Sequence, residues 1–567
     1  MRRALPGGIR LVVTIAVLVA VAAAAVLASG GSSARRTAGA CPAGQRLVPA
    51  TAEAGAPAGE KAREHAAKGA AGDYESHFLG KCAPVAHPES NADLFKFNDF
   101  ASTRQGSDSP RAFAKALRQR DRLAQDAAAA NIPGTAGHWA PYGHGPLIAD
   151  DPTYPTTQGD GFGKIEGRIN DFAYVDSTKK LYAAVAQGGL WESSDLGASW
   201  KSIGDNLPIQ STGAVNYTPA GGGTLIVATG DMAFSNDYAG VGTYWSTNDG
   251  GTWHKSKGAP DGALSFRVAV DPTNPKVVYL ATGFGLFRST DAGRNFTNVN
   301  LPTGDCAGDS SKPNCFFANV VTDVAVQSAD HFGNKGGAVV AAVGWRAGQF
   351  PNFNKKPQAP ANGLYRSDSG TPGSFTKVPD SAGFTSTDRT GRVALGTTTG
   401  ADQNSGYLYA VSQDSQLFVE QSGGENDIPL VGTPSVLDAI YVSTDFGKTW
   451  TVMESRNEFF NPANGSALSQ LTALGIGPGY QVTYNEWIKP DPTRTAPNGS
   501  PARVLLGMEE VWQTNSTQLV PQDGHSQFQV IGAYTANGGA CLAVPEQCGT
   551  IQANKQDFTT THPDQHG

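Results

Sequence analysis

Three acidic residues stand at matching positions in segments predicted to be strands. Asp171 and Glu486 each lie five residues before an Asp that begins a turn, Asp176 and Asp491, and Asp323 takes the same place in a segment without that turn. Two converging carboxylates, about 5 to 10 Å apart, can serve as the acid and the base or nucleophile of glycosidic-bond hydrolysis. The three acids are therefore catalytic candidates. The alternative is that they line a hydrated channel and bond to neighbouring backbone.

Basic and aromatic side chains near these acids are candidates for ligand binding. Arg168 and Arg392 precede or begin predicted inner strands, and Arg267 lies within a third such strand. Three arginines together can bind the carboxylate of a ligand. Trp345 and Trp487 can stack on sugar rings.

Two groups of residues have the oxygen or nitrogen ligands that metal ions prefer. Asp231, Asn236 and Asp237 could coordinate a hard cation such as Ca²⁺, with a solvated loop as the alternative. Every second residue from His562 to His566 is a candidate transition-metal ligand, and the alternative is the start of a strand or a frayed terminus. We assign no metal site, and Ca²⁺ is the one cofactor considered.

One eight-residue pattern recurs along the chain: hydroxyl, any residue, Asp, any residue, Gly, any residue, hydroxyl, aromatic. A short polar side chain beside a turn accepts hydrogen bonds from backbone N–H groups, and Gly supplies a positive φ. We call each copy a corner and expect it to be structural. The defining residues are Ser193, Asp195, Gly197 and Trp200; Ser246, Asn248, Gly250 and Trp253; Ser289, Asp291, Gly293 and Phe296; and Ser443, Asp445, Gly447 and Trp450. A looser copy spans 367–375, and an eroded one begins at Thr514.

These corners resemble the Asp-box, or BNR, repeat of sialidases, sortilin-type receptors, xyloglucanases and photosystem II assembly factors. The resemblance covers about residues 139–567 and implies an all-β fold, a β-propeller of about six to seven four-stranded blades. It implies no single activity, because those relatives differ in function. The chain departs from two of them: no Tyr–Glu nucleophile pair of the sialidase kind can be placed in the sequence, and Gln187 stands where xyloglucanase-like enzymes carry an Asp before Gly-Gly.

The first blade can be predicted strand by strand, as 168–175, 181–186, 189–193 and 200–203. Later corners are spaced more widely than the about 40 to 50 residues that a blade needs, so the surplus must be loop. The long insertions are 231–240, 344–361 and 412–438, between second and third strands, and 306–315, after an outer strand. In an antiparallel blade these connections emerge at the end opposite the corners, where we expect function.

The first residues indicate export. Arg2, Arg3 and Arg10 precede an apolar run over 11–28, which predicts that residues 1–30 are a secretory signal peptide or an N-terminal membrane anchor. Residues 31–108 are an Ala/Gly-rich spacer, mostly irregular. A helical extension over 109–138 is expected to pack on the propeller of 139–567. Either the N-terminal segment completes the ring, or the chain belongs to a longer protein.

Composition supports an exported all-β protein. Charged residues make up 16% of the chain, Gly numbers 69, and the net charge is −7 with no basic run in the propeller region. This argues against nucleic-acid binding. Six cysteines fall into neighbouring couples, which predicts three local disulfides formed in an oxidising compartment. The couples are Cys41 with Cys82, Cys306 with Cys315, and Cys541 with Cys548.

Together these features predict a monomeric, extracellular or cell-surface propeller that binds a polysaccharide or protein on the face opposite the corners. One alternative is a glycoside hydrolase, sialidase- or xyloglucanase-like, with Asp171, Asp323 or Glu486 as acid and base. Another is a sortilin-like receptor or assembly module. Two acids facing each other in an open cleft would favour hydrolysis. Acids that are paired with arginine or buried would favour binding.

Overall fold

The computed structural model describes the core of the chain and several short elements before it. The described residues are 45–48, 81–84, 112–129, 147–148, 164–165, 168–231, 239–308, 317–344, 361–415, 437–459, 461–466, 482, 486–508, 510–514 and 527–532. The predicted signal or anchor, 1–30, lies outside them. No helix in the described part of the chain is long and apolar enough to cross a membrane.

Six four-stranded antiparallel sheets follow one another along the chain, and in each of them consecutive strands pair. We number them sheets 1 to 6. Sheets 1 to 3 comprise β5 (Ile169–Val175), β6 (Lys180–Val185), β7 (Gly189–Ser193) and β8 (Lys201–Ser202); β9 (Thr212–Thr218), β10 (Thr224–Thr229), β11 (Thr243–Ser246) and β12 (His254–Lys255); and β13 (Ser265–Val270), β14 (Val278–Thr282), β15 (Gly285–Ser289) and β16 (Thr297–Asn298).

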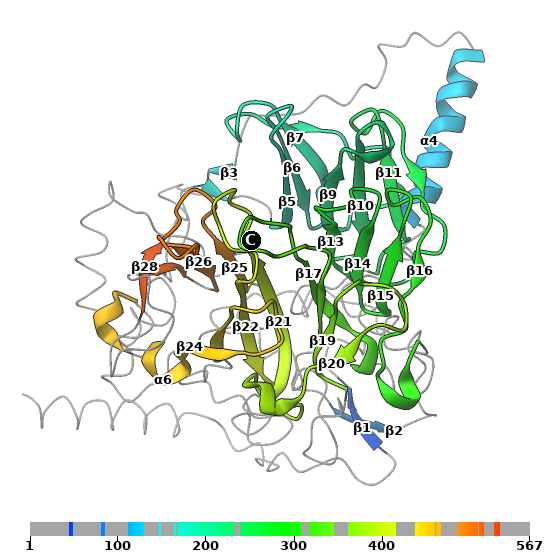
Figure 1. Cartoon of the computed structure of the whole chain (residues 1–567). Helices are drawn as coiled ribbons and strands as arrows, with labels where there is room; N and C mark the ends of the chain where they lie inside the picture. The colour runs from blue at the N-terminus through cyan, green and yellow to red at the C-terminus, as the bar shows by residue number, and fades with distance from the viewer. Residues whose placement is uncertain are drawn as a thin grey trace, which may run out of the picture.

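Sheets 4 to 6 comprise β17 (Val321–Val326), β18 (Val339–Val343), β19 (Gly363–Ser367) and β20 (Thr376–Lys377); β21 (Thr390–Thr397), β22 (Leu408–Asp414), β23 (Leu437–Ser443) and β24 (Thr451–Ser455); and β25 (Trp487–Pro490), β26 (Val504–Gly507), β27 (Val511–Thr514) and β28 (Phe528–Gly532). Figure 1 shows the sheets arranged around a common centre, from β5 to β28 in orange-red. The first strand of each sheet lies at that centre, so the described chain is a six-bladed all-β propeller.

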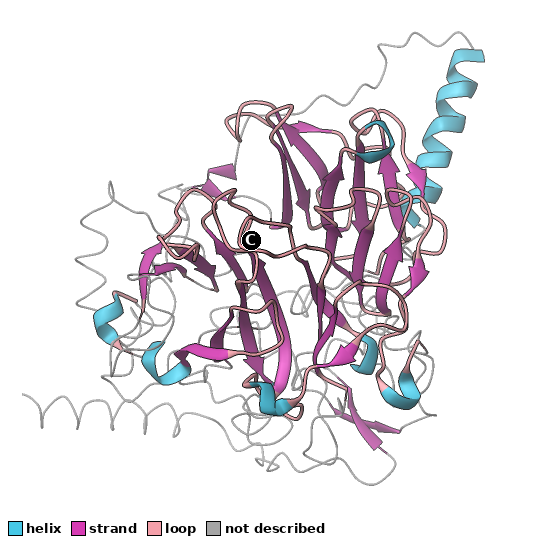
Figure 2. Cartoon of the chain, in the orientation of Figure 1, coloured by secondary structure: helices cyan, strands magenta, loops and turns pink. Residues whose placement is uncertain are grey.

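The remaining elements are short, apart from one helix. They are the strand pairs β1 (Gln45–Val48) with β2 (Lys81–Pro84) and β3 (Leu147–Ile148) with β4 (Lys164–Ile165), the helices α4 (Ala112–Ala129) and α6 (Arg456–Phe459), and the 3-10 turns η3 (Ala220–Gly222), η4 (Gly304–Cys306), η5 (Phe317–Asn319), η6 (Asp380–Ala382) and η7 (Pro462–Asn464). Strands dominate the described fold (Figure 2).

The N-terminal elements differ in part from expectation. The β1–β2 pair lies within the segment that we expected to be mostly irregular. The helix predicted near 109–130 is α4, but its Leu123 is 60% exposed. Packing of this helix on the propeller therefore stays a prediction.

Sheet 1 matches its prediction to within one or two residues at each boundary. Apolar residues on both faces of the inner strands explain why the sheets stack. All six residues of β17 are buried because it has sheets on both sides, whereas β5 alternates between buried and exposed residues. Sheets pack face to face through interdigitating side chains.

Five clusters of buried side chains join successive sheets. They connect sheet 1 to 2, 2 to 3, 3 to 4, 4 to 5, and 5 to 6. Within the described residues, no such cluster joins sheet 6 to sheet 1.

The corners of sheets 1 to 5 each form a compact hydrogen-bonded turn between the third and fourth strands of the sheet. In sheet 5, Ser443 Oγ donates to Asp445 Oδ1 at 2.9 Å and accepts from Gly447 N at 2.8 Å. Asp445 Oδ1 also accepts from Thr449 N at 2.8 Å. The corners of sheets 1, 2 and 3 repeat this pattern, with Asn248 as the acceptor in sheet 2. The corner residues thus satisfy backbone donors that the hairpin leaves unpaired.

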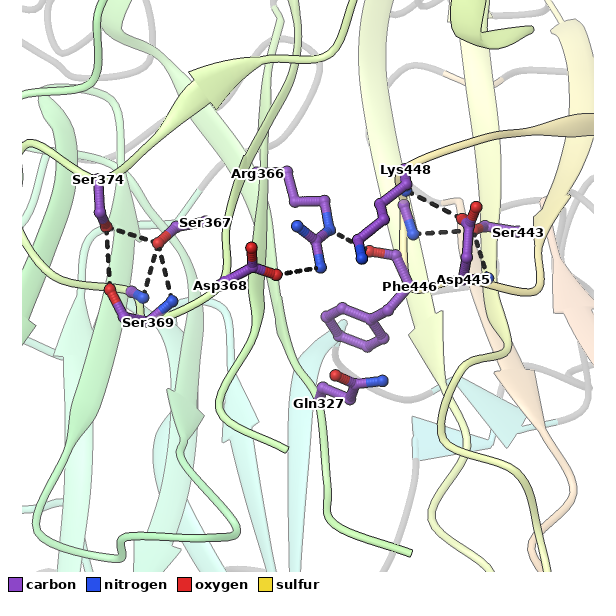
Figure 3. A network of polar contacts seen from close by, with 12 residues as sticks. Gln327, Arg366, Ser367, Asp368, Ser369, Ser374, Ser443, Asp445, Phe446 and Lys448 are labelled. Carbon is purple, nitrogen blue, oxygen red and sulfur yellow. Dashed lines mark hydrogen bonds and ion pairs between the residues drawn. The ribbon is translucent and has the colours of Figure 1, made fainter. Parts of the chain in front are cut away.

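The corners also fasten neighbouring sheets together. Figure 3 shows Arg366 of sheet 4 donating from Nε to the carbonyl of Phe446 in the sheet 5 corner, at 2.8 Å. Tyr182 of sheet 1 donates to Asp249 in the sheet 2 corner at 2.7 Å. Tyr279 of sheet 3 donates to the carbonyl of Gly370 in the sheet 4 corner at 3.2 Å. Each of these corners therefore rests on the sheet that precedes it.

The long insertions emerge at the end of the sheets opposite the corners. Because consecutive strands are antiparallel, connections between second and third strands and between sheets share one end, and corners share the other. We call the insertion-bearing end the loop face. The connections β10–β11, β18–β19, β22–β23 and β16–β17 open there, as the sequence predicts.

Substitution of the corner glycine tests this arrangement. Gly447 has φ +83°, and a Cβ there would lie 2.7 Å from Cγ2 of the buried Val340 in sheet 4. Gly373, in the looser corner, has φ +79° and nothing within 4 Å. Gly373→Ala should cost about 1 to 2 kcal/mol from backbone strain alone. Gly447→Ala should cost a further ~1 to 3 kcal/mol from overpacking. Urea unfolding measures both, and equal losses would contradict the account.

Candidate functional site at the propeller axis

Charged side chains from four sheets converge at the axis. Arg267 on β13 donates from Nη1 to Asp171 Oδ1 at 2.9 Å and from Nε to Asp323 Oδ1 at 3.0 Å. Asp171 lies on β5 and Asp323 on β17, so one guanidinium links sheets 1, 3 and 4. The sequence prediction that the two acids lie at matching positions is consistent with this geometry.

A local irregularity of the inner strands places these three residues. The register of each strand against its partner shifts between Ile169 and Asp171, between Ser265 and Arg267, and between Val321 and Asp323. Such bulges re-aim a side chain out of the regular alternation. Arg267 therefore occupies the position in its sheet that the acids occupy in theirs.

The two carboxylates also accept backbone hydrogen bonds from neighbouring sheets. Asp171 Oδ2 accepts from Val215 N of β9 at 3.1 Å, and Asp323 Oδ2 accepts from Leu395 N of β21 at 2.8 Å. Both side chains are buried. Burial raises the pKa of Asp171, and the Arg267 charge opposes that rise. These acids hold adjacent inner strands together and do not face open solvent.

Glu486, the third candidate acid, does not join that pair. It lies immediately before β25, is 4% exposed, and forms an ion pair with Arg392, in which Nε and Oε1 are 2.8 Å apart. The Arg392 guanidinium lies 5.9 Å from the centre of the Phe266 ring. The ion pair of Glu486 is therefore separate from the pairs that Arg267 forms with Asp171 and Asp323.

Arg168 and Asp231 form another ion pair, between sheets 1 and 2, in which Asp231 is buried and Arg168 is half-buried. One carboxylate oxygen of Asp231 contacts Arg168, and the other accepts from Ser211 Oγ. Burial raises the pKa of Asp231 to about 6, although Arg168 opposes the rise. All three arginines predicted to bind a ligand carboxylate are therefore engaged with acids of the chain itself.

Lys489 on β25 is the axial charge that the sequence prediction missed. Its side chain is exposed, and it has no ion-pair partner among the described residues. The positive charge of Arg267, followed by desolvation, lowers the pKa of Lys489 to about 8, while Asp171 and Asp323 act in the opposite direction. The Arg267 charge is the main cause of this lower pKa, because an exposed ammonium keeps much of its hydration. The sequence signal that could have indicated Lys489 is the strand alternation, in which Trp487 and Lys489 alternate with the buried Ile488 and Pro490.

Several predicted site residues lie outside the described part of the chain, namely Asp237, Trp345, Cys41, Cys315, Cys541 and Cys548. Trp487 is described and half-buried. Cys306 is disulfide-bonded, and the three pairings stay predictions. The described residues contain no cluster of three or more His, Cys, Asp or Glu side chains that could hold a metal ion. Ca²⁺ binding at Asp231 stays a hypothesis, and it would have to compete with Arg168.

Comparison with known proteins finds similar propeller structures among solved proteins. No family model and no curated protein matches this chain. Among solved structures it is similar to an ancestral GH74 enzyme, with a TM-score of 0.41 and 16% identity over 65% of this chain and 44% of that one. The GH74 xyloglucanase from Xanthomonas campestris gives 0.33 and 15%, covering 64% and 54%. YCF48 bound to D1 peptide gives 0.33 and 13%, covering 64% and 82%.

This chain spans about half of the length of the GH74 structures that it matches. At these identities the similarity concerns the propeller fold alone and carries no argument about activity. The described residues thus form a six-bladed propeller in which the acids at the centre are paired with arginine.

Arg267→Met tests the role of the shared guanidinium. Removing Arg267 leaves two buried carboxylates without their ion-pair partner, which should cost about 3 to 5 kcal/mol of stability. Lys179→Met breaks an exposed pair with Asp176 and should leave the free energy of unfolding nearly unchanged. The free energy of urea unfolding distinguishes the two variants. A loss for Arg267→Met as small as that of the control would contradict the assignment.

The pH dependence of stability tests the buried Asp231. Its pKa is about 6 in the folded chain, against an ordinary value of 3.8, so the folded state binds the proton more tightly. Its contribution is therefore present below pH 4 and is lost as pH rises through 6, by on the order of 3 kcal/mol. Asp231→Asn should lose correspondingly less stability than wild type between pH 4 and pH 7. The exposed control Asp176→Asn should follow wild type, and superimposable curves for all three chains would refute the prediction.

Proposed function

We propose that this chain is an exported Asp-box propeller that binds an extracellular polysaccharide or protein at its loop face. The observation that carries the proposal is the engagement of all three candidate acids with arginine: Asp171 and Asp323 with Arg267, and Glu486 with Arg392. The local hydrogen bonds of the corners support the Asp-box assignment. Export and a monomeric state rest on the sequence features of the N-terminus and the cysteines.

The geometry at the axis disfavours glycoside hydrolysis as the primary activity. A general acid needs a proton to donate at the scissile bond, and a base or nucleophile needs access to the substrate. Asp171, Asp323 and Glu486 are each less than 5% exposed, and each is in an ion pair. A substrate would have to displace a guanidinium from a buried carboxylate before either role could begin.

The loop face is where the chain departs from a minimal propeller. Sheets 2, 4 and 5 carry long connections between their second and third strands, and the connection between sheets 3 and 4 is extended as well. Loops held by a rigid scaffold commonly provide binding residues. A sortilin-like receptor or assembly role would use the same face for a protein ligand. Any glycoside hydrolase activity would use the axial acids instead.

A glycan array with the secreted protein, scored for both retention and cleavage, tests the proposal. We expect retention without cleavage. Asp388 lies exposed on the connection between sheets 4 and 5 at the loop face, and Thr444 lies exposed in the sheet 5 corner. Asp388→Arg should weaken binding at least about tenfold, which is about 1.4 kcal/mol. Thr444→Arg introduces the same side chain at the opposite end and should leave affinity unchanged.

Two outcomes would overturn this proposal. Cleavage that disappears in Glu486→Gln or Asp171→Asn would assign the hydrolase function. Loss of binding in Thr444→Arg, with Asp388→Arg unaffected, would place the ligand at the corners. If no glycan is retained, the same variant pair applied to binding of extracellular proteins tests the receptor alternative.

A further inference from the structure

Lys489 carries a positive charge that no acid of the described chain contacts directly. It lies on β25, the inner strand of sheet 6, and its side chain is exposed, while its neighbours Ile488 and Pro490 are buried. In the described part of the chain its ammonium group forms no ion pair and no hydrogen bond. An ammonium group is a donor only, so its N–H groups are open to an acceptor that comes from outside the chain.

A second cation, Arg267, lies beside this ammonium group. β13 and β25, which carry the two residues, both lie at the centre of the ring of sheets (Figure 1). The Arg267 charge lowers the pKa of Lys489, and the Lys489 charge acts in turn on Asp171, an acid that Arg267 binds. Arg267 uses Nε and Nη1 for its acids, and its Nη2 has no partner among the described residues. Its side chain is 22% exposed, so two cations with unused donors meet at the axis.

The two acids bound to Arg267 are already satisfied by the chain itself. The carboxylates of Asp171 and Asp323 each accept two backbone N–H hydrogen bonds of 2.8 to 3.1 Å, and each accepts a further one from Arg267. Such hydrogen bonds stabilise the charged form of a carboxylate. Both acids are also covered by protein, at 4% and 2% exposed. An anion that approaches the axis therefore meets the exposed Lys489 before it meets either carboxylate.

We propose that Lys489 and Arg267 bind a sulfate or phosphate group at the propeller axis. Lysine binds such groups as a point charge, and arginine adds donors of fixed direction. A tetrahedral oxyanion has several acceptor oxygens, so one group can accept from both residues. Neighbouring cations repel each other, and a dianion offsets this repulsion more fully than a carboxylate with its single charge. This site does not depend on what the loop face binds.

Equilibrium dialysis of the full chain against radiolabelled sulfate, at constant ionic strength, tests the proposal. Lys489→Met should weaken sulfate binding at least about tenfold, because it removes a hydrogen bond between charged groups. Lys276→Met is the matched control, since Lys276 is an exposed lysine on the turn after β13 with no ion pair to a described residue. This control should bind sulfate as wild type does. Equal affinities for wild type and Lys489→Met, or no sulfate bound to wild type, would overturn the proposal.

The pH dependence of sulfate affinity separates direct contact with Lys489 from an indirect effect. The charged groups that act on its ammonium are Arg267 on β13, Asp171 on β5 and Asp323 on β17, and its pKa is about 8. Because sulfate keeps its charge in this range while Lys489 loses its proton, wild-type affinity should fall about tenfold between pH 7 and pH 9. Lys489→Arg stays charged and should bind without that fall. The same fall in wild type and in Lys489→Arg would contradict a contact between Lys489 and the anion.

Competition with two polymers identifies the source of the anion. Displacement of labelled sulfate by dextran sulfate, and not by uncharged dextran, would support the site and assign its ligand to an ester group on a polysaccharide. Retention of sulfate in the presence of both polymers would support the site with a free ion as its ligand. Displacement by dextran as readily as by dextran sulfate would contradict the proposal, because the charged group would then not be what is recognised.

Discussion

The contact between Arg267 and the carboxylates of Asp171 and Asp323 links sheets that share no β-ladder. Each described sheet is hydrogen-bonded within itself, and the inner strands approach one another at the axis through side chains. A buried charge is tolerated only where it is paired and hydrogen-bonded. The ion pairs at the axis therefore fix the positions of these sheets relative to one another.

The corners provide the second constraint. A corner satisfies its own backbone donors and at the same time presents a carbonyl or side chain to the sheet before it, as Phe446 does to Arg366 and Asp249 does to Tyr182. The proposed recognition would use the other end of the sheets, where the long connections emerge.

Much of the fold could be predicted from the sequence because its signals are local. The corner pattern, the alternation of apolar residues and the turn residues predicted the strands of sheet 1 closely, and the same signals placed the insertions at one end. The equivalence of Asp171 and Asp323 followed from strand alignment. Arg267 was recognised as a charged inner-strand residue, but its contacts depend on where a bulge shifts the register, and no local signal reports that.

Other features depend on the whole ring. Glu486 aligns with the two aspartates in sequence, yet it has a different arginine because Arg392 approaches from sheet 5. Lys489 lies two residues after Trp487 on the same strand. The sequence did not single it out, because its lowered pKa depends on Arg267, which is far away in the sequence. The choice between six and seven blades likewise depends on which faces remain uncovered, and this requires coordinates.

The central claim is that the axial acids are held by arginine and do not form a hydrolytic pair. A crystal structure of the full-length protein, at a resolution that places carboxylate oxygens, tests it most directly. The account predicts Arg267 within hydrogen-bonding distance of both Asp171 and Asp323, and Arg392 against Glu486. Two of these carboxylates turned away from arginine and facing each other across open solvent would contradict it.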